Sequence, residues 1–161
     1  MIKKTFSILS IIATMAFFGN SAFAQNLYVE PSLGVSVINN VTNANWTIAK
    51  EFPVRYGLAI GKDVTKSLAI EEETSFTKLR NSGASIVSET INAKVMVLPS
   101  VYAKIGAGAG YIPSTEAHAF EYVAGVGTTS IKPVDLGITV VNANGVGIHN
   151  QLPLTAGIKI D

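Results

Sequence analysis

The sequence predicts an all-β protein, folded as an eight-stranded antiparallel up-and-down transmembrane β-barrel. Three observations support this prediction. The chain begins with an export signal, its remaining segments alternate between apolar and polar residues, and glycine and charge gather on one face of those segments. A chain of 161 residues has room for one domain of this kind.

The N-terminal segment has the order of a secretory signal. A basic start is followed by an apolar stretch over 6–18 and by an A-x-A sequence that ends at Ala24. The apolar stretch is short for a spanning helix, which needs about 20 residues. We therefore expect a signal peptide over 1–24 and an outer-membrane β-barrel domain over 25–161.

The composition of the exported part excludes several classes of protein. Without Lys3 and Lys4 it keeps ten basic and eleven acidic residues, and this net charge of about −1 offers no attractive field for nucleic acid. The chain has no Cys, which excludes disulfides, thiolate metal sites and cysteine nucleophiles. The exported part also lacks an apolar run near 18 residues, although it is rich in Val, Ile, Ala and Gly. Alternating membrane strands have this composition.

Eight segments alternate with period two and are predicted to be strands. Most contain about nine to twelve residues, the length that a tilted strand needs to cross a bilayer, whereas strands of soluble proteins average about five or six. An even number of strands places both termini at the same end of the barrel. The predicted strands are 27–38, 54–62, 67–78, 87–97, 101–111, 120–129, 134–141 and 152–160.

The connections between these segments alternate in length. Short turns at one end and longer polar loops at the other are typical of an outer-membrane barrel. The short connections are 63–66, 98–100 and 130–133, and the longer ones are 39–53, 79–86, 112–119 and 142–151.

Glycine and charge share one face of the predicted strands, and this face is expected to line the barrel interior. Glycine leaves space for long charged side chains, which can pair across a narrow lumen, while the apolar face meets lipid. We expect the cations Arg55, Lys94, Lys104 and Lys159 to contact Glu30, Glu71, Glu73 and Glu121. The full predicted lumen network is Glu30, Arg55, Glu71, Glu73, Lys94, Lys104, Glu121, Asp135 and Lys159.

The apolar face carries aromatic residues near the long-connection ends of its strands. Tyr56, Phe76, Tyr111 and Phe120 have this position, which predicts an interfacial aromatic girdle. Glu72 interrupts the pattern because it also falls on the apolar parity. A β-bulge or protonation of Glu72 would relieve the cost of placing a carboxylate in lipid.

On these features, residues 25–161 resemble the outer-membrane β-barrel family that includes the OmpA transmembrane domain and related small surface proteins. In that family the last strand carries an assembly signal, which Thr155, Gly157 and Ile160 match, while its terminal aromatic would fall beyond Asp161. The resemblance implies a monomer in a bacterial cell outer membrane. It also implies contact with outer-membrane lipid and with the outer-membrane assembly machinery.

The leading functional hypothesis is a non-enzymatic surface protein whose barrel anchors four extracellular loops, available for recognition or adhesion to an unknown extracellular or host ligand. Barrels that trim acyl chains need a His and a Ser close together on a lipid-facing strand, but His118 and His149 fall in predicted loops. We expect no catalytic residues, no cofactor and no metal site, since metal sites need three or four ligands. The candidate recognition residues are Trp46, Phe52, Arg80 and His118.

Two alternatives remain open at this stage. A small narrow pore is possible in principle, although the inward charges would fill the lumen of an eight-stranded barrel. A soluble exported barrel that carries a small ligand, like a lipocalin, would need the apolar face inside.

Overall fold

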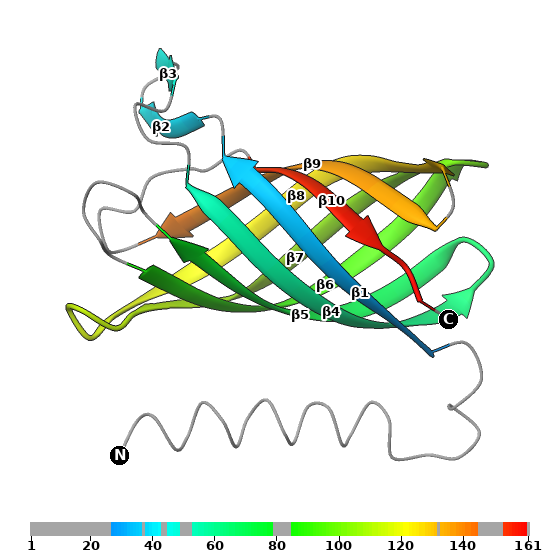
Figure 1. The fold of residues 1–161 in the computed structure, drawn as a ribbon, viewed down its shortest axis with the longest axis horizontal. Coiled ribbons are helices and arrows are strands. Elements are labelled where there is room, and N and C mark those ends of the chain that lie inside the picture. The colour runs from blue at the N-terminus through cyan, green and yellow to red at the C-terminus, as the bar shows by residue number, and fades with distance from the viewer. Residues whose placement is uncertain are drawn as a thin grey trace.

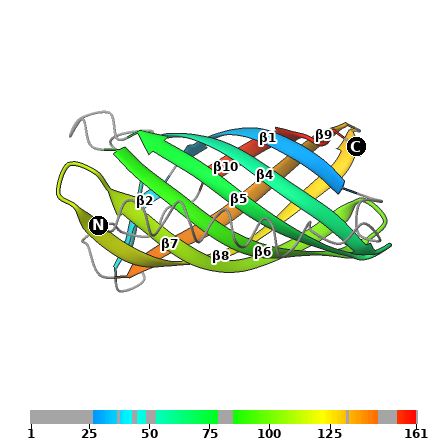
Figure 2. The same cartoon turned by 90° about the horizontal axis from the view of Figure 1, so that it is seen from below.

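The computed structural model confirms the predicted fold class. In the described part of the chain, eight antiparallel strands close one barrel, and they run obliquely around it in the two views of Figures 1 and 2. Among the same residues, no helix is long and apolar enough to cross a membrane. The structure describes residues 27–36, 38–42, 45–48, 53–78, 85–131, 133–144 and 153–160. The predicted signal peptide over 1–24 lies outside them.

Each barrel strand pairs with the next along the chain, and β1 closes the barrel between β4 and β10. The ladders β4–β5, β5–β6, β6–β7 and β7–β8 join almost the full length of their strands, which satisfies the backbone polar groups internally as a membrane requires. The barrel strands are β1 (Leu27–Ser36), β4 (Val54–Thr65), β5 (Leu68–Lys78), β6 (Ser85–Leu98), β7 (Val101–Ile112), β8 (Ala117–Ile131), β9 (Val134–Asn144) and β10 (Pro153–Ile158).

A second, two-stranded sheet occupies part of the predicted 39–53 connection. It pairs β2 (Ile38–Thr42) with β3 (Asn45–Ile48), and Figure 1 shows it beyond the end of the barrel where β1 stops. The first strand was predicted over 27–38, but β1 ends at Ser36 and Ile38 belongs to β2, and the predicted polar connection over 39–53 contains paired strands. The asparagines of this segment suggested a loop, but its β-branched and aromatic residues favour extended pairing.

The connections at the end where β1 begins are short, and we call this the short-turn end. Two-residue turns, Lys66–Ser67 and Pro99–Ser100, join β4 to β5 and β6 to β7. The ladder register shifts just before each turn, between Asp63 and Thr65 and between Met96 and Leu98. The strands therefore continue into connections that the sequence predicted as turns, because a bulge absorbs the irregularity without ending the ladder.

The predicted 112–119 connection at the opposite end is a short turn instead of a long loop. β7 and β8 pair up to Ile112 and Ala117, which leaves four turn residues, Pro113–Glu116. Proline suits an early position of such a turn, and Glu116 has the left-handed conformation, with φ at 54°, that lets the chain re-enter the ladder. The prediction of a long loop here is wrong for this reason.

The outer face of the barrel is apolar and the inner face is polar. Large apolar side chains are exposed on every barrel strand, for example Leu58, Ile105 and Ile138. Charged side chains are buried inside, with Glu71 only 1% exposed. A soluble lipocalin-like barrel has the opposite arrangement, so the structure contradicts that alternative. These are the two faces of a barrel that spans a membrane.

The predicted aromatic girdle is confirmed on the outer face. Tyr56 and Phe76 are register partners on β4 and β5, and both are exposed. On β7 and β8, Tyr111 lies 4.8 Å from His118 between ring centroids, and Phe120 lies 4.8 Å from Tyr122 in an edge-to-face arrangement. These rings lie near the end opposite the short turns, on β4, β5, β7 and β8, where an interfacial belt is expected.

Carboxylates also occur on the outer face. Glu72 pairs with Ile60 and Ile91 in ladders that do not shift at that point, so no bulge turns it inward. Glu89 of β6 also lies on the outer face, opposite Thr74 of β5, and was not singled out from the sequence.

Candidate functional site

The densest group of charged side chains lies inside the barrel and forms two connected clusters. Parity alone turns these side chains inward, because each occupies an alternate position in a strand whose other positions face outward. Because these side chains are buried, their pairing matters for the stability of the barrel: breaking a buried ion pair leaves an uncompensated charge.

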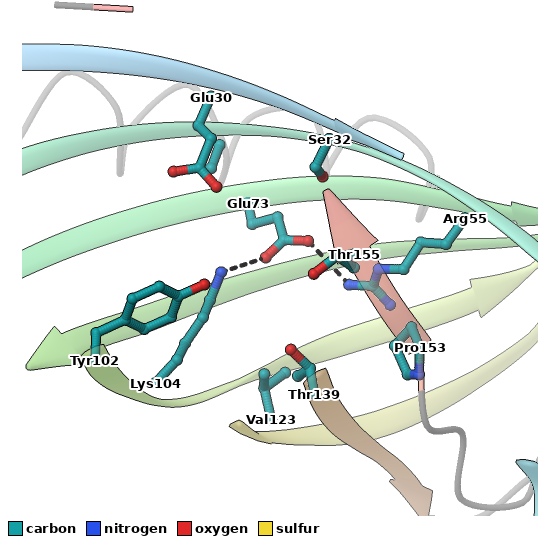
Figure 3. A pocket seen from close by; sticks show the side chains of 11 residues that line it. Glu30, Ser32, Arg55, Glu73, Tyr102, Lys104, Val123, Thr139, Pro153 and Thr155 are labelled. Atoms are coloured by element: carbon teal, nitrogen blue, oxygen red, sulfur yellow. Dashed lines mark hydrogen bonds and ion pairs between the residues drawn. The ribbon is translucent and has the colours of Figure 1, made fainter. Parts of the chain in front are cut away.

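The first cluster surrounds Glu73 of β5 (Figure 3). Arg55 of β4 donates from Nη2 to Glu73 Oε1 at 3.2 Å, and Lys104 of β7 donates from Nζ to Oε2 at 2.9 Å. Asn92 of β6 adds a longer hydrogen bond to Oε2 at 3.4 Å. Donors from three strands therefore hold this carboxylate.

The second cluster surrounds Lys94 of β6. Its Nζ lies 3.1 Å from Glu30 Oε2 and 3.3 Å from Glu71 Oε1, and it also pairs with Asp135. Lys104 lies 3.0 Å from the other oxygen of Glu71, which connects this cluster to the first. The joined clusters link side chains of β1, β4, β5, β6, β7 and β9, so they tie together strands that are distant in sequence.

Two tyrosines complete the second cluster. The Tyr28 hydroxyl donates to Glu71 Oε1 and the Tyr102 hydroxyl donates to Asp135 Oδ1, both at 2.6 Å. Each ring lies over the glycine that is its register partner, Gly61 or Gly127, where a Cβ would overlap the ring. Neither tyrosine was predicted to belong to the network, although a tyrosine on the lumen parity opposite a glycine was a usable signal.

The remaining predicted members lie apart from the two clusters. Lys159 pairs with Asp63 at 3.0 Å near the short-turn end, where both side chains are partly exposed, and its ammonium lies 3.9 Å from the centroid of the Tyr28 ring. Glu121 is buried and accepts a hydrogen bond from Ser88 at 2.9 Å. Among the described residues it takes part in no ion pair, which contradicts the predicted cation contact.

A cavity of about 30 Å³ remains inside the barrel beside the first cluster. Figure 3 shows Ser32, Thr139 and Thr155 around it, together with Arg55 and Lys104. This volume suits about one water molecule, whereas small-molecule sites occupy about 300–1,000 Å³. In the described residues, no three His, Asp or Glu side chains are placed to share a metal ion.

The four predicted recognition residues are dispersed. His118 belongs to β8 and not to a loop, and it is exposed beside Tyr111 at the end opposite the short turns. Trp46 belongs to β3 of the small hairpin. Phe52 and Arg80 lie outside the described residues, as does His149.

No protein-family model and no curated protein matches the chain. Solved structures with the same fold do exist, and three similar ones are outer-membrane proteins. The outer membrane protein Ail of Yersinia pestis in a phospholipid bilayer nanodisc is 14% identical, with 83% of this chain and 99% of that chain covered and a TM-score of 0.57. The N-terminal β-barrel domain of Pseudomonas aeruginosa OprF is 13% identical, with 84% and 98% covered and a TM-score of 0.56. The outer membrane enzyme PagL is 15% identical, with 83% and 99% covered and a TM-score of 0.55.

At these identities the similarity establishes a shared fold. The fold agrees with the resemblance to OmpA-like barrels that the sequence indicates. Because one of the three similar structures is an enzyme, the fold does not decide between enzymatic and non-enzymatic roles.

Proposed function

We propose that the chain is a bacterial outer-membrane surface protein whose barrel is a non-enzymatic anchor for its extracellular connections. The observation that carries this proposal is the inversion of polarity, with exposed apolar side chains outside and paired charges inside. An apolar outer face of this extent is stable in lipid and unfavourable in water. The partners are then outer-membrane lipid, the assembly machinery that inserts the barrel, and an extracellular or host ligand.

The interior supports an anchor more than a pore. Arg55, Lys94 and Lys104 each form ion pairs inside the lumen, and the cavity beside the first cluster holds about one water molecule. An eight-stranded barrel has room for little more than such side chains. Recognition therefore falls to the connections, where Trp46, Phe52 and Arg80 are the proposed contact residues, with His118 on the adjoining strand.

Cell fractionation tests the location. The chain, with residues 1–24 in place, would be expressed in a Gram-negative host and its membranes washed with carbonate. We expect the protein in the outer-membrane fraction, shortened by removal of the signal peptide, and shifted in electrophoretic mobility on heating as the barrel unfolds. Recovery in the soluble periplasm would contradict the proposal.

Two further measurements separate the roles of such a barrel. Mass spectrometry of lipid A from the expressing cells should show unchanged acyl chains, and a change in those chains would overturn the non-enzymatic role.

A variant with residues 79–84 replaced by a Gly-Ser linker should keep the folded barrel. If loops carry recognition, cells with this variant or with the linker in place of 43–52 should adhere less to host cells or matrix. Equal adhesion of both variants and the parent would contradict the recognition role.

A further inference from the structure

The carboxylate of Glu121 is the one part of the lumen network that the described ion pairs leave uncompensated. Glu121 is 3% exposed, and its Oε1 accepts a hydrogen bond from the Ser88 hydroxyl at 2.9 Å. Within the described residues, Oε2 is buried and has no hydrogen-bond partner, and no lysine or arginine nitrogen lies within ion-pair distance. Such a buried charge is unfavourable unless another group compensates it.

The Ser88 hydroxyl of β6 contacts this carboxylate, and a second hydroxyl lies one strand further round the barrel. Ser75 of β5 and Ser88 of β6 are register partners, and both are buried. Among the described residues the Ser75 hydroxyl also lacks a partner. Gly110 of β7 lies between Ser88 and β8, and a Cβ there would collide with Glu121 Oε1. The glycine therefore provides the space in which Glu121 reaches across β7 to Ser88, whose register partner is Ser75.

The charge balance of the lumen points to a missing positive charge. Five buried carboxylates, those of Glu30, Glu71, Glu73, Glu121 and Asp135, face three cationic side chains in the described clusters. The three cations are engaged by the other four carboxylates. Glu121 is therefore the one of these five carboxylates that the three cations do not engage in an ion pair.

We propose that Glu121, with the hydroxyls of Ser75 and Ser88, binds a small monovalent cation such as Na⁺ or K⁺ inside the barrel. Carboxylate and hydroxyl oxygens are the ligands that hard cations prefer. One carboxylate suits a single positive charge, whereas Ca²⁺ takes about six to eight oxygen ligands that include several carboxylates. The ion neutralises Glu121 and stabilises the folded barrel. This inference concerns the interior alone, so it does not depend on the function proposed for the connections.

The test compares refolding from urea in NaCl, in KCl and in N-methyl-D-glucamine chloride at equal ionic strength. Equal ionic strength keeps general screening constant, and the organic cation is too large for the site. We expect a higher urea midpoint in Na⁺ or K⁺ than in N-methyl-D-glucamine, and the midpoint should rise with the concentration of the small cation, as ligand linkage requires.

Two variants locate the effect. Glu121→Gln should abolish the difference between cations, while Glu116→Gln, a control at an exposed position in the adjoining turn, should retain it. Ser75→Ala should reduce the difference and serves as the deciding variant if Glu121→Gln does not fold. The proposal is overturned if the wild-type midpoint is the same in all three salts. It is also overturned if the cation effect survives both Glu121→Gln and Ser75→Ala, or if stability responds to pH alone, which would mean that a proton neutralises Glu121.

Discussion

Replacing Lys94 with methionine removes the cation that the most lumen carboxylates share. Its Nζ lies 3.1 Å from Glu30 and 3.3 Å from Glu71, and it pairs with Asp135. Methionine keeps a long unbranched side chain, so the change removes charge with little change in packing. Glu71 retains Lys104 at 3.0 Å, but Glu30 and Asp135 have no second cation among the described ion pairs.

The expected magnitude follows from burial. The side chains of Lys94, Glu30 and Asp135 are 8%, 11% and 3% exposed. Removing one partner of a buried ion pair costs about 3–5 kcal/mol because the other charge is left buried and unpaired. We expect a loss in this range for Lys94→Met. Lys159→Met is the control, because its pair with Asp63 is 29% and 42% exposed and is worth about 0–1 kcal/mol. Its ammonium also lies 3.9 Å from the Tyr28 ring centroid, a contact worth about 0.5–2 kcal/mol, so the total loss should stay below that of Lys94→Met.

Urea unfolding of the barrel, refolded into detergent micelles or lipid vesicles, measures both free energies. Adding Asp135→Asn to Lys94→Met should recover part of the loss, because the double variant leaves one fewer unpaired carboxylate. If Lys94→Met and Lys159→Met lower the free energy of unfolding equally, the buried ion pairs of the lumen do not stabilise the barrel more than an exposed pair does. Failure of the double variant to recover any stability would lead to the same conclusion.

Three further perturbations test the faces and the lumen. Ile105→Arg should destabilise the barrel by about 2–4 kcal/mol and Val97→Arg by about 0–1 kcal/mol, since charge on the lipid face costs most at mid-membrane. Equal effects of the two variants in urea unfolding would contradict the placement of Ile105 at mid-membrane and Val97 near the interface. Gly127→Ala should cost about 1–3 kcal/mol, because the new Cβ would meet both the Tyr102 ring and the Leu136 carbonyl, and an unchanged unfolding midpoint would contradict this tight packing. In planar bilayers the unmodified protein should show only rare, small openings, and Glu73→Gln should make them more frequent or lower stability. Steady large conductance of the unmodified protein would favour the pore.

The strands and their faces could be predicted because membrane barrels sort polarity by parity. Lys104 and Ile105 are adjacent in sequence, and their opposite chemistry already assigns them to opposite faces. Strand ends were less predictable, because Asp63 and Pro113 resemble loop residues while the ladder hydrogen bonds continue up to or past them. Local turn geometry, which residue type reflects only weakly, decides where a ladder ends.

The composition of the lumen could be predicted, but its pairing could not. Parity directs Lys94 and Asp135 inward, yet their contact joins β6 to β9 across the barrel, and it depends on strand stagger. Glu121 illustrates the same limit, because its level in the lumen brings it to Ser88 and not to a described cation. Which charges meet is a property of the closed barrel and not of any single strand.

The orientation of the two faces can be measured directly by nitroxide scanning of residues 134–140 on β9. The chain has no Cys, so each position can carry a single engineered label without removing a native residue. In lipid vesicles, collision with oxygen should peak at Leu136, Ile138 and Val140 and fall between them, while collision with a water-soluble nickel complex stays low at the peaks. Oxygen maxima at positions 135, 137 and 139, or no two-residue period, would contradict a barrel whose apolar face meets lipid.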